Sequence, residues 1–204
     1  MTYIMYIVKW YPNRGKDVRV TRKQAEANRE KVLDVAGTLF RERGFEGIGV
    51  ADIMKRAGLT HGGFYGQFAS KDDLAAETTE RVLKNPRWQE RLTGKANPSF
   101  AEVVRGYLSP GHRDDPGTGC LIAALGSDAA RQPRAVRRAL TDGFRVRLDA
   151  WLKLLPGRSV AARREKALVT MATLVGALII ARAVDDPALS DEVLEATATE
   201  LRRR

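Results

Sequence analysis

Apolar residues recur every three or four positions along most of the chain, which is the spacing of one face of a helix. No stretch of comparable length alternates as a strand does. The first apolar stripe predicts a helix between Thr21 and Gly44, and Thr21 with Gln24 forms a capping-box pair at its start. A shorter stripe follows at Val50, Ile53, Met54 and Ala57. The pattern predicts an all-α fold.

The segment 50–74 predicts two short helices joined by a tight turn and followed by a third helix, which is the outline of a helix-turn-helix. Gly58 can end the first helix in the left-handed conformation, and Thr60 is a suitable N-cap for the next, over about 61–67. Ser70 then begins an S-x-x-D capping pair that starts a further helix.

Two features of this segment favour contact with a nucleic acid. Gly62 and Gly63 each cost about 1 kcal/mol relative to alanine inside a helix, and a closely approaching nucleic-acid backbone would explain them. Lys71 opposes the helix macrodipole in a first turn, but a cation there suits a helix N-terminus that holds phosphate. A solvated lysine is the alternative interpretation.

The chain beyond this segment predicts a larger helical body. The third helix should break near Pro86, and Ser99 with Glu102 caps the next one. After a Pro/Gly-rich loop over 109–119, a small-residue helix is expected over about 120–130. A long amphipathic helix then presents an apolar stripe of Val136, Leu140, Phe144, Leu148, Trp151, Leu152 and Leu155.

The last two predicted helices, over about 161–184 and 191–203, favour a dimer. The first is apolar nearly all round, and one protomer is not expected to bury both of its faces. Its uncharged run, 167–181, is shorter than the roughly 20 residues that span a bilayer, so no membrane span is expected. The alternative is a helix in the core of the body. The expected interface residues are Met171, Ala172, Val175, Gly176, Ile179, Ile180, Leu194, Ala198 and Leu201.

These patterns divide the chain into three parts: an extension over 1–20, expected to be flexible, a helix-turn-helix head over 21–69, and a larger helical body over 70–204, which is expected to dimerise. The extension is apolar at its start and lacks the features of a signal peptide. An arm along DNA phosphates and a solubilising tail are both open interpretations of the basic leading segment.

Composition narrows the classes of function. The chain has 35 Lys+Arg against 25 Asp+Glu, a formal net charge of +10, which favours a partner such as DNA. One cysteine excludes an intramolecular disulfide, and with two histidines it predicts no metal site, so no cofactor is expected and a reducing cytoplasm fits. No nucleophile elbow, phosphate-binding glycine loop or His–Cys pairing is recognisable, which argues against an enzyme and leaves no catalytic residues to name.

The run from Phe45 to Leu74 carries the pattern F-x-x-x-x-V-x-D-I-x-x-x-A-G-L-T-x-G-x-F-Y-x-x-F-x-S-K-D-x-L. It resembles the DNA-binding domain of the tetracycline-repressor (TetR/AcrR) family, and with the upstream residues 28–29 and 39–44 the likeness covers about a quarter of the chain. The resemblance implies a twofold dimer that presents two recognition helices to a palindromic operator in double-stranded DNA.

The same resemblance assigns roles to single residues. Those expected to face the groove are Thr60, His61, Gly62 and Gly63, and those expected to hold phosphates are Tyr65 and Lys71. A capping role for Thr60 and a solvated His61 are the alternatives. Gly49 departs from the family pattern, which often has Ser or Thr there, so it offers no hydroxyl to phosphate, although glycine is a tolerable N-cap.

The body of such a regulator would hold a small-molecule effector. Candidate pocket residues, which could equally be core, are Phe100, Tyr107, Leu121, Leu125, Phe144, Leu148 and Trp151. If Thr118 caps the following helix, Cys120 lies in its first turn, where the dipole favours a reactive thiolate; a small buried hydrophobe is the alternative. The function predicted is a dimeric repressor released from its operator by a small-molecule or redox signal, and the rival is an architectural DNA-binding protein without effector response.

Overall fold

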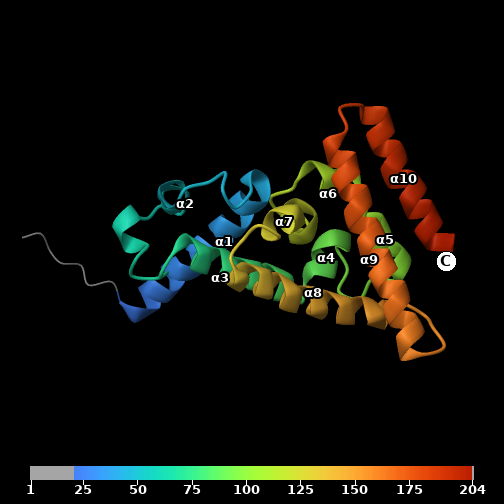
Figure 1. Cartoon of the computed structure of the whole chain (residues 1–204), viewed down its shortest axis with the longest axis horizontal. Helices are drawn as coiled ribbons and strands as arrows, with labels where there is room; N and C mark the ends of the chain where they lie inside the picture. Colours follow the sequence, from blue (N-terminus) through green and yellow to red (C-terminus); the bar gives the residue numbers. More distant parts are fainter. Residues whose placement is uncertain (1–20, 204) are drawn as a thin grey trace, which may run out of the picture.

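The computed structural model describes residues 21–203, and within that range it contains helices and no strands. Figure 1 shows an elongated arrangement, with the head at one end and a pair of antiparallel helices at the other. The all-α prediction is confirmed. The expected extension over 1–20 lies outside the described residues. The elements are α1 (Arg22–Arg43), α2 (Val50–Arg56), the 3-10 helix η1 (His61–Gly63), α3 (Lys71–Lys84), α4 (Trp88–Thr93), α5 (Phe100–Tyr107), α6 (Pro110–Asp114), α7 (Leu121–Ala129), α8 (Arg134–Leu154), α9 (Val160–Ala183) and α10 (Pro187–Arg203).

The head is built around α1, as its apolar stripe predicts. The Thr21 hydroxyl accepts the Gln24 amide at 3.2 Å, and Gly44 ends the helix with a positive φ of 78°. Gly58 has a φ of 68°, so the turn after α2 uses the left-handed conformation expected of it. These caps orient α1, α2 and η1 around one cluster whose fully buried large side chains include Phe40, Phe45, Ile53, Met54 and Phe64.

Helix α3 connects the head to the body. The Ser70 hydroxyl caps it by accepting the Asp73 amide at 3.0 Å, and it ends at Lys84, before Pro86, as predicted. It packs along α8, and a Cβ on Gly143 of α8 would lie 2.4 Å from the Cβ of Leu83. Only a glycine permits this approach, so the closest contact between the two helices depends on that residue.

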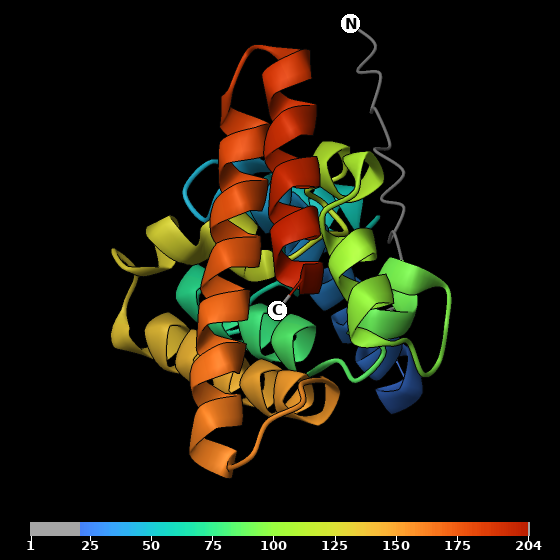
Figure 2. The same cartoon turned by 90° about the vertical axis from the view of Figure 1, so that its right-hand side faces the viewer.

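The body surrounds α9 on several sides. Figure 2 shows α9 and α10 as an antiparallel pair, and α9 also packs against α8, α7 and α6. By length and a mean hydropathy of 1.6 over its most apolar window, α9 could cross a membrane. Its buried side chains, however, belong to the second apolar cluster, together with Leu148 and Trp151 of α8. One face of α9 therefore packs in the core of its own protomer.

Two sequence predictions about the body are wrong in detail. Residues 110–114 form helix α6 instead of belonging to a loop, because Ser109 caps the segment and Pro110 suits a first helical position. Helix α10 begins at Pro187 rather than near 191, and the Asp186 carboxylate accepts the first free amides, those of Ala188 and Leu189. Ser190 therefore lies inside the helix.

Candidate DNA-binding surface and effector cavity

The segment expected to read DNA is less helical than predicted. Regular structure is limited to the 3-10 helix η1, with Thr60 in the N-cap position but without a side-chain capping bond. Backbone turns continue the segment, since the Phe68 amide donates to the Phe64 carbonyl at 3.0 Å. The Phe64 and Phe68 rings stack at 5.5 Å on the inner side, as the four-residue spacing predicts. With these rings packed inward, the opposite side of the segment faces solvent.

The two glycines of η1 have no role inside the protomer that requires glycine. A Cβ at Gly62 would meet nothing within 4 Å, and at Gly63 the nearest atom would be the Thr60 hydroxyl at 3.6 Å. Neither residue has a positive φ. Neither packing nor backbone conformation therefore requires glycine at these two positions. The main chain here is uncovered and can be approached by another molecule.

The side chains beside η1 are exposed. Tyr65 is 66% exposed, and its ring meets the rings of His61 and Phe64 edge-on at 5.7 and 5.2 Å. Lys71 is half-buried, and its ammonium lies 3.4 Å from the Glu46 carboxylate, a distance typical of a weak ion pair. Exposed residues of the predicted set are Thr60, His61, Gly62, Gly63 and Tyr65, so the structure brings the six predicted DNA-contacting residues to one end of the head.

A cavity of about 290 Å³ lies where the head meets the body, and we call it the body cavity. Helices α1 and α3 to α9 contribute to its walls. Four of the predicted pocket residues line it, namely Tyr107, Cys120, Leu121 and Trp151. Met171 and Val175, both predicted at the dimer interface, also line it.

The other four predicted pocket residues do not line the body cavity. Leu125 and Leu148 are fully buried in the two apolar clusters, and Phe144 packs against the second one. Phe100 lies against the edge of Trp151, with ring centroids 6.0 Å apart, and lines a separate, smaller hollow. These positions are core, the alternative that an apolar stripe always leaves open.

His112 is a wall residue that the sequence did not single out. Its Nδ1 lies 2.7 Å from the Tyr107 carbonyl and must donate to it, while its Nε2 accepts the Cys120 amide at 2.9 Å. Both bonds require a neutral ring, and burial lowers the pKa of His112. The S-P pair at 109–110, a signal for a helix start, could have indicated that this segment is ordered.

Two arginines of the cavity wall, the buried Arg41 and the half-buried Arg147, also escaped the sequence analysis. Arg41, in the last turn of α1, donates through Nε to the Gly117 carbonyl at 2.7 Å, and its Nη2 contacts the same oxygen. Arg147 of α8 donates to the carbonyls of Val82 and Asn85 at 2.9 and 3.2 Å, and thereby satisfies the C-terminal end of α3. A signal existed for Arg41, because it follows Leu33 by eight residues and so falls on the buried stripe of α1.

The predicted setting of Cys120 requires correction. Cys120 is itself the N-cap of α7, one position before the first turn, and makes no side-chain capping bond. Thr118 does not cap the helix, because its hydroxyl donates to the Asp115 carboxylate at 2.6 Å. The thiol is half-buried in the cavity wall.

Comparison with known proteins shows what this arrangement resembles. Residues 32–78 match the family described as "Bacterial regulatory proteins, tetR family". The HTH-type transcriptional regulator AcrR of Shigella flexneri is 39% identical over 67 residues, which are 33% of this chain and 31% of that protein. Residues 32–78, in the head, therefore belong to the TetR family of bacterial regulatory proteins.

Other relatives extend this likeness. The HTH-type transcriptional repressor KstR2 of Mycobacterium tuberculosis is 32% identical over 77 residues, 37% of this chain and 38% of that protein. The chain thus matches about a third of the length of these curated relatives. The E. coli NemR structure in its reduced form has a TM-score of 0.69 at 21% identity, over 87% of this chain and 96% of that one. A TetR-family regulator from Cytophaga hutchinsonii gives 0.70 at 20%, over 88% and 96%. The TetR-family fold therefore covers head and body.

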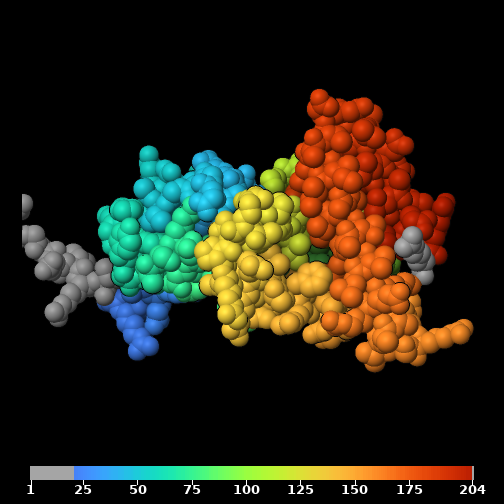
Figure 3. Space-filling view, in the orientation of Figure 1, coloured from blue at the N-terminus to red at the C-terminus, as the bar shows by residue number. Residues whose placement is uncertain are grey.

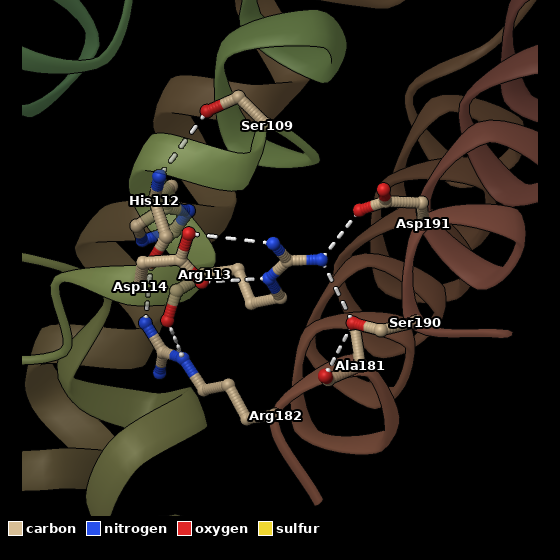
Figure 4. A network of polar contacts seen from close by, with 8 residues as sticks. All are labelled: Ser109, His112, Arg113, Asp114, Ala181, Arg182, Ser190 and Asp191. Carbon is tan, nitrogen blue, oxygen red and sulfur yellow. Dashed lines mark hydrogen bonds and ion pairs between the residues drawn. The ribbon is translucent and has the colours of Figure 1, made fainter. Parts of the chain in front are cut away.

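A polar network joins one wall of the cavity to α9 and α10 (Figure 4). Arg182 of α9 donates to the carbonyls of His112 and Arg113 at 2.6 and 2.9 Å and so caps the end of α6. Arg113 in turn donates to Ser190 at 2.9 Å and pairs with Asp191 at 2.5 Å. The wall of the cavity is thereby attached to both C-terminal helices.

The outer face of α9 carries the largest group of exposed aliphatic residues among those described. Figure 3 shows its surface uncovered by other helices. Exposed members are Leu168, Val169, Ile179 and Ile180, with Leu189 beyond them on α10. Of the predicted interface residues, Ala172, Val175, Gly176, Ile179 and Ile180 are exposed or half-buried.

The remaining four predicted interface residues are corrected to core positions. Met171, Leu194, Ala198 and Leu201 are buried in the second apolar cluster of the same protomer. Leu194, Ala198 and Leu201 of α10 pack inside this cluster, and Met171 of α9 lines the body cavity. They are therefore not available to a second copy.

Proposed function

We propose that the chain is a cytoplasmic, sequence-specific DNA-binding repressor. The observation that carries the proposal is the pair of glycines in η1, whose surroundings are open although nothing inside the protomer requires glycine. An unobstructed main chain lets a groove wall approach closely. Thr60 and His61 would then contact base edges, and Tyr65 and Lys71 would hold phosphates on either side.

The proposed active form is a twofold dimer. Support comes from the exposed aliphatic face of α9, which is larger than a soluble protomer needs. The absence of any atom within 4 Å of a Cβ at Gly176 leaves room for a second helix against this face. Two copies of α9 and α10 would form a four-helix interface and present two heads to successive major grooves about 34–36 Å apart.

The repressor is proposed to respond to a signal received in the body. The body cavity touches the head through Arg41 and the connecting helix through Val82 and Leu83, so a ligand there can change the placement of α3. Cys120 offers a second route, since its thiol lies in the same wall. Either event would alter the spacing of the two heads and lower the affinity for the operator.

The deciding experiment is selection of bound sites from a random DNA pool by the purified full-length chain. An enriched palindrome supports a specific dimeric regulator. Failure to enrich any sequence, together with a steep salt dependence, would favour an architectural DNA-binding protein instead. Gel shifts of the selected site with and without thiol oxidant, using the chain and its Cys120→Ser variant, then test the redox route.

Variants of the head test the proposed contacts. Tyr65→Phe and Lys71→Ala should weaken binding to selected and random DNA alike, because phosphate contacts carry no sequence information. Loss of the Lys71 contact should also reduce the slope of log K against log salt concentration by about one. Lys153→Ala, which removes an equal charge from an exposed site at the far end of α8, is the matched control. Unchanged affinity in both head variants contradicts the proposed phosphate contacts.

A further inference from the structure

The wall of the body cavity contains positively charged side chains and no negatively charged ones among the described residues. Arg41, Arg91 and Arg147 reach it from α1, α4 and α8. Among the described residues that line it, none is an aspartate or a glutamate. Asp115 and Glu42 act on Arg41 only from outside the lining. A cavity with cations on three sides and no carboxylate in its wall favours a negatively charged occupant.

Two of these guanidinium groups are held where water does not solvate them well. Burial lowers the pKa of Arg41 to about 10 and that of Arg147 also to about 10. Both groups stay charged at neutral pH, and their hydrogen bonds to backbone carbonyls offset only part of the cost of desolvation. An anion in the cavity would reduce that cost, whereas a neutral molecule of the same shape would not.

Hydrogen-bond donors in the wall lack partners. Arg41 uses Nε and Nη2 on the Gly117 carbonyl, and its Nη1 is buried with no partner. The Tyr107 hydroxyl is likewise buried, and its neighbour is the Cys120 thiol rather than an oxygen or nitrogen partner. Burial first, and then the charge of Cys120 and a hydrogen bond to it, raise the pKa of Tyr107 well above the usual value. The hydroxyl therefore keeps its proton and can donate. Unpaired buried donors are rare in native proteins and require an explanation.

The rest of the wall is flat and apolar. Trp88 and Trp151 lie with ring centroids 5.6 Å apart at one side, and Arg147 stacks over the Trp88 ring at 4.8 Å. Leu92 and Met171 extend the apolar surface. A volume of about 290 Å³ suits a compact molecule, at the lower end of the range of small-molecule sites.

We propose that the body cavity binds a small organic carboxylate with a flat apolar body, and that Arg41 Nη1 and the Tyr107 hydroxyl donate hydrogen bonds to the carboxylate. The regulatory meaning of this site rests on the effector response proposed above. The chemical class of the ligand does not, because it follows from the cavity walls alone. Arg41 also gives the carboxylate a direct contact with α1 of the head.

The test is calorimetric titration of the full chain, without DNA, with three probes: 2-naphthoate, its neutral isostere 2-naphthamide, and acetate. The proposal expects 2-naphthoate to bind at least tenfold more tightly than the amide, because only the anion pairs with the arginines. Acetate should bind weakly, because it lacks the apolar body.

Variants assign the preference to the two donors. Arg41→Gln should remove most of the preference for 2-naphthoate, and Arg105→Gln, with the same charge change at an exposed position on α5, should keep it. Since Arg41 also holds the Gly117 carbonyl, Tyr107→Phe provides a second variant that removes only a hydroxyl. It should lower the preference about threefold or more with an unchanged melting temperature.

Two results would overturn the proposal. One is equal affinity for 2-naphthoate and 2-naphthamide. The other is a preference that persists in both Arg41→Gln and Tyr107→Phe. A carboxylate that binds as expected but leaves operator affinity unchanged supports this site and contradicts the proposed effector response, so the two failures are distinguishable.

Discussion

The head and the body use opposite devices for their candidate sites. In the head the candidate contact residues are on the surface. No atom lies within 4 Å of a Cβ at Gly62, and Tyr65 is 66% exposed beside the buried rings of Phe64 and Phe68. In the body the candidate residues are inside, where Arg41 and Tyr107 have buried donors without an oxygen or nitrogen partner. The candidate surface site is recognised by residues that no other part of the protomer covers. The candidate interior site is recognised by buried hydrogen-bond donors that lack an acceptor.

Truncating a leucine in each region should show the largest difference. Leu33 is 4% exposed in the head cluster, whereas Leu92 is half-buried and lines the body cavity. Leu33→Ala should lower the free energy of unfolding by about 2–5 kcal/mol, and Leu92→Ala by less than half of that, because part of its surface already faces open space. Urea denaturation of both variants measures this, and equal losses would mean that the cavity wall is as tightly packed as the head.

Gly143 tests how firmly the body holds the connecting helix. Gly143→Ala should destabilise the fold by about 1–3 kcal/mol, since the new methyl group would overlap Leu83 of α3. Gly126→Ala in α7 is the matched control, because its Cβ would make only an ordinary contact with Ile122 at 3.7 Å, and it should stabilise by about 0.5–1 kcal/mol. Thermal melting of both variants measures the two changes. An unchanged melting temperature in Gly143→Ala would show that α3 and α8 can move apart to accommodate the methyl group.

His112 makes the stability of the body depend on pH. Burial lowers its pKa in the folded state below the ordinary value of about 6.5, so its contribution to stability is complete above pH 6.5 and is lost as the pH falls toward the folded pKa. Protonation would place an N–H of the ring against the Cys120 amide. Besides burial, the hydrogen bond to the Tyr107 carbonyl and the charge of Asp115 raise the pKa of His112, and the charge of Arg182 lowers it.

The measurement is the melting temperature between pH 8 and pH 5. It should fall less in His112→Gln than in the unmodified chain over this interval. His61→Gln, at an exposed position, should follow the unmodified chain. Parallel curves for all three proteins would exclude a role for His112.

Gly62→Ala should have the smallest effect on stability, a change of about 1 kcal/mol or less, because its Cβ would meet nothing within 4 Å. Its effect should appear in DNA affinity instead, since the methyl group would stand between the main chain and the groove. Gel shift of the selected operator measures this. Unimpaired binding would remove the argument that these glycines serve DNA.

The sequence predicted the head well because its signals are local. The caps at Thr21 and Ser70 and the left-handed turn at Gly58 each act over a few residues, and the structure confirms them. Two features of the head were missed: the burial of Arg41, and the helix over 61–67, which shrinks to η1. Two glycines give little local stability, so the tertiary anchors at Phe64 and Phe68 set its form.

The body was harder because its cavity is assembled from residues distant in the chain. Apolar stripes identified the long helices but could not separate core from lining, so Leu125 and Leu148 were placed in the pocket. Charged residues were treated as surface residues, which concealed Arg41 and Arg147. Their burial becomes visible only once Gly117, Val82 and Asn85 are in place to accept their hydrogen bonds.

The position of Arg41 limits how modular the molecule is. Its side chain belongs to the interior of the body, yet its backbone is the last turn of the first helix of the head. In a hybrid that takes residues up to Gly44 from a relative, Arg41 would be lost from the wall of the body cavity along with the exchanged part of the head. A graft that exchanges the proposed DNA-contacting segment must therefore keep Arg41, or begin after it.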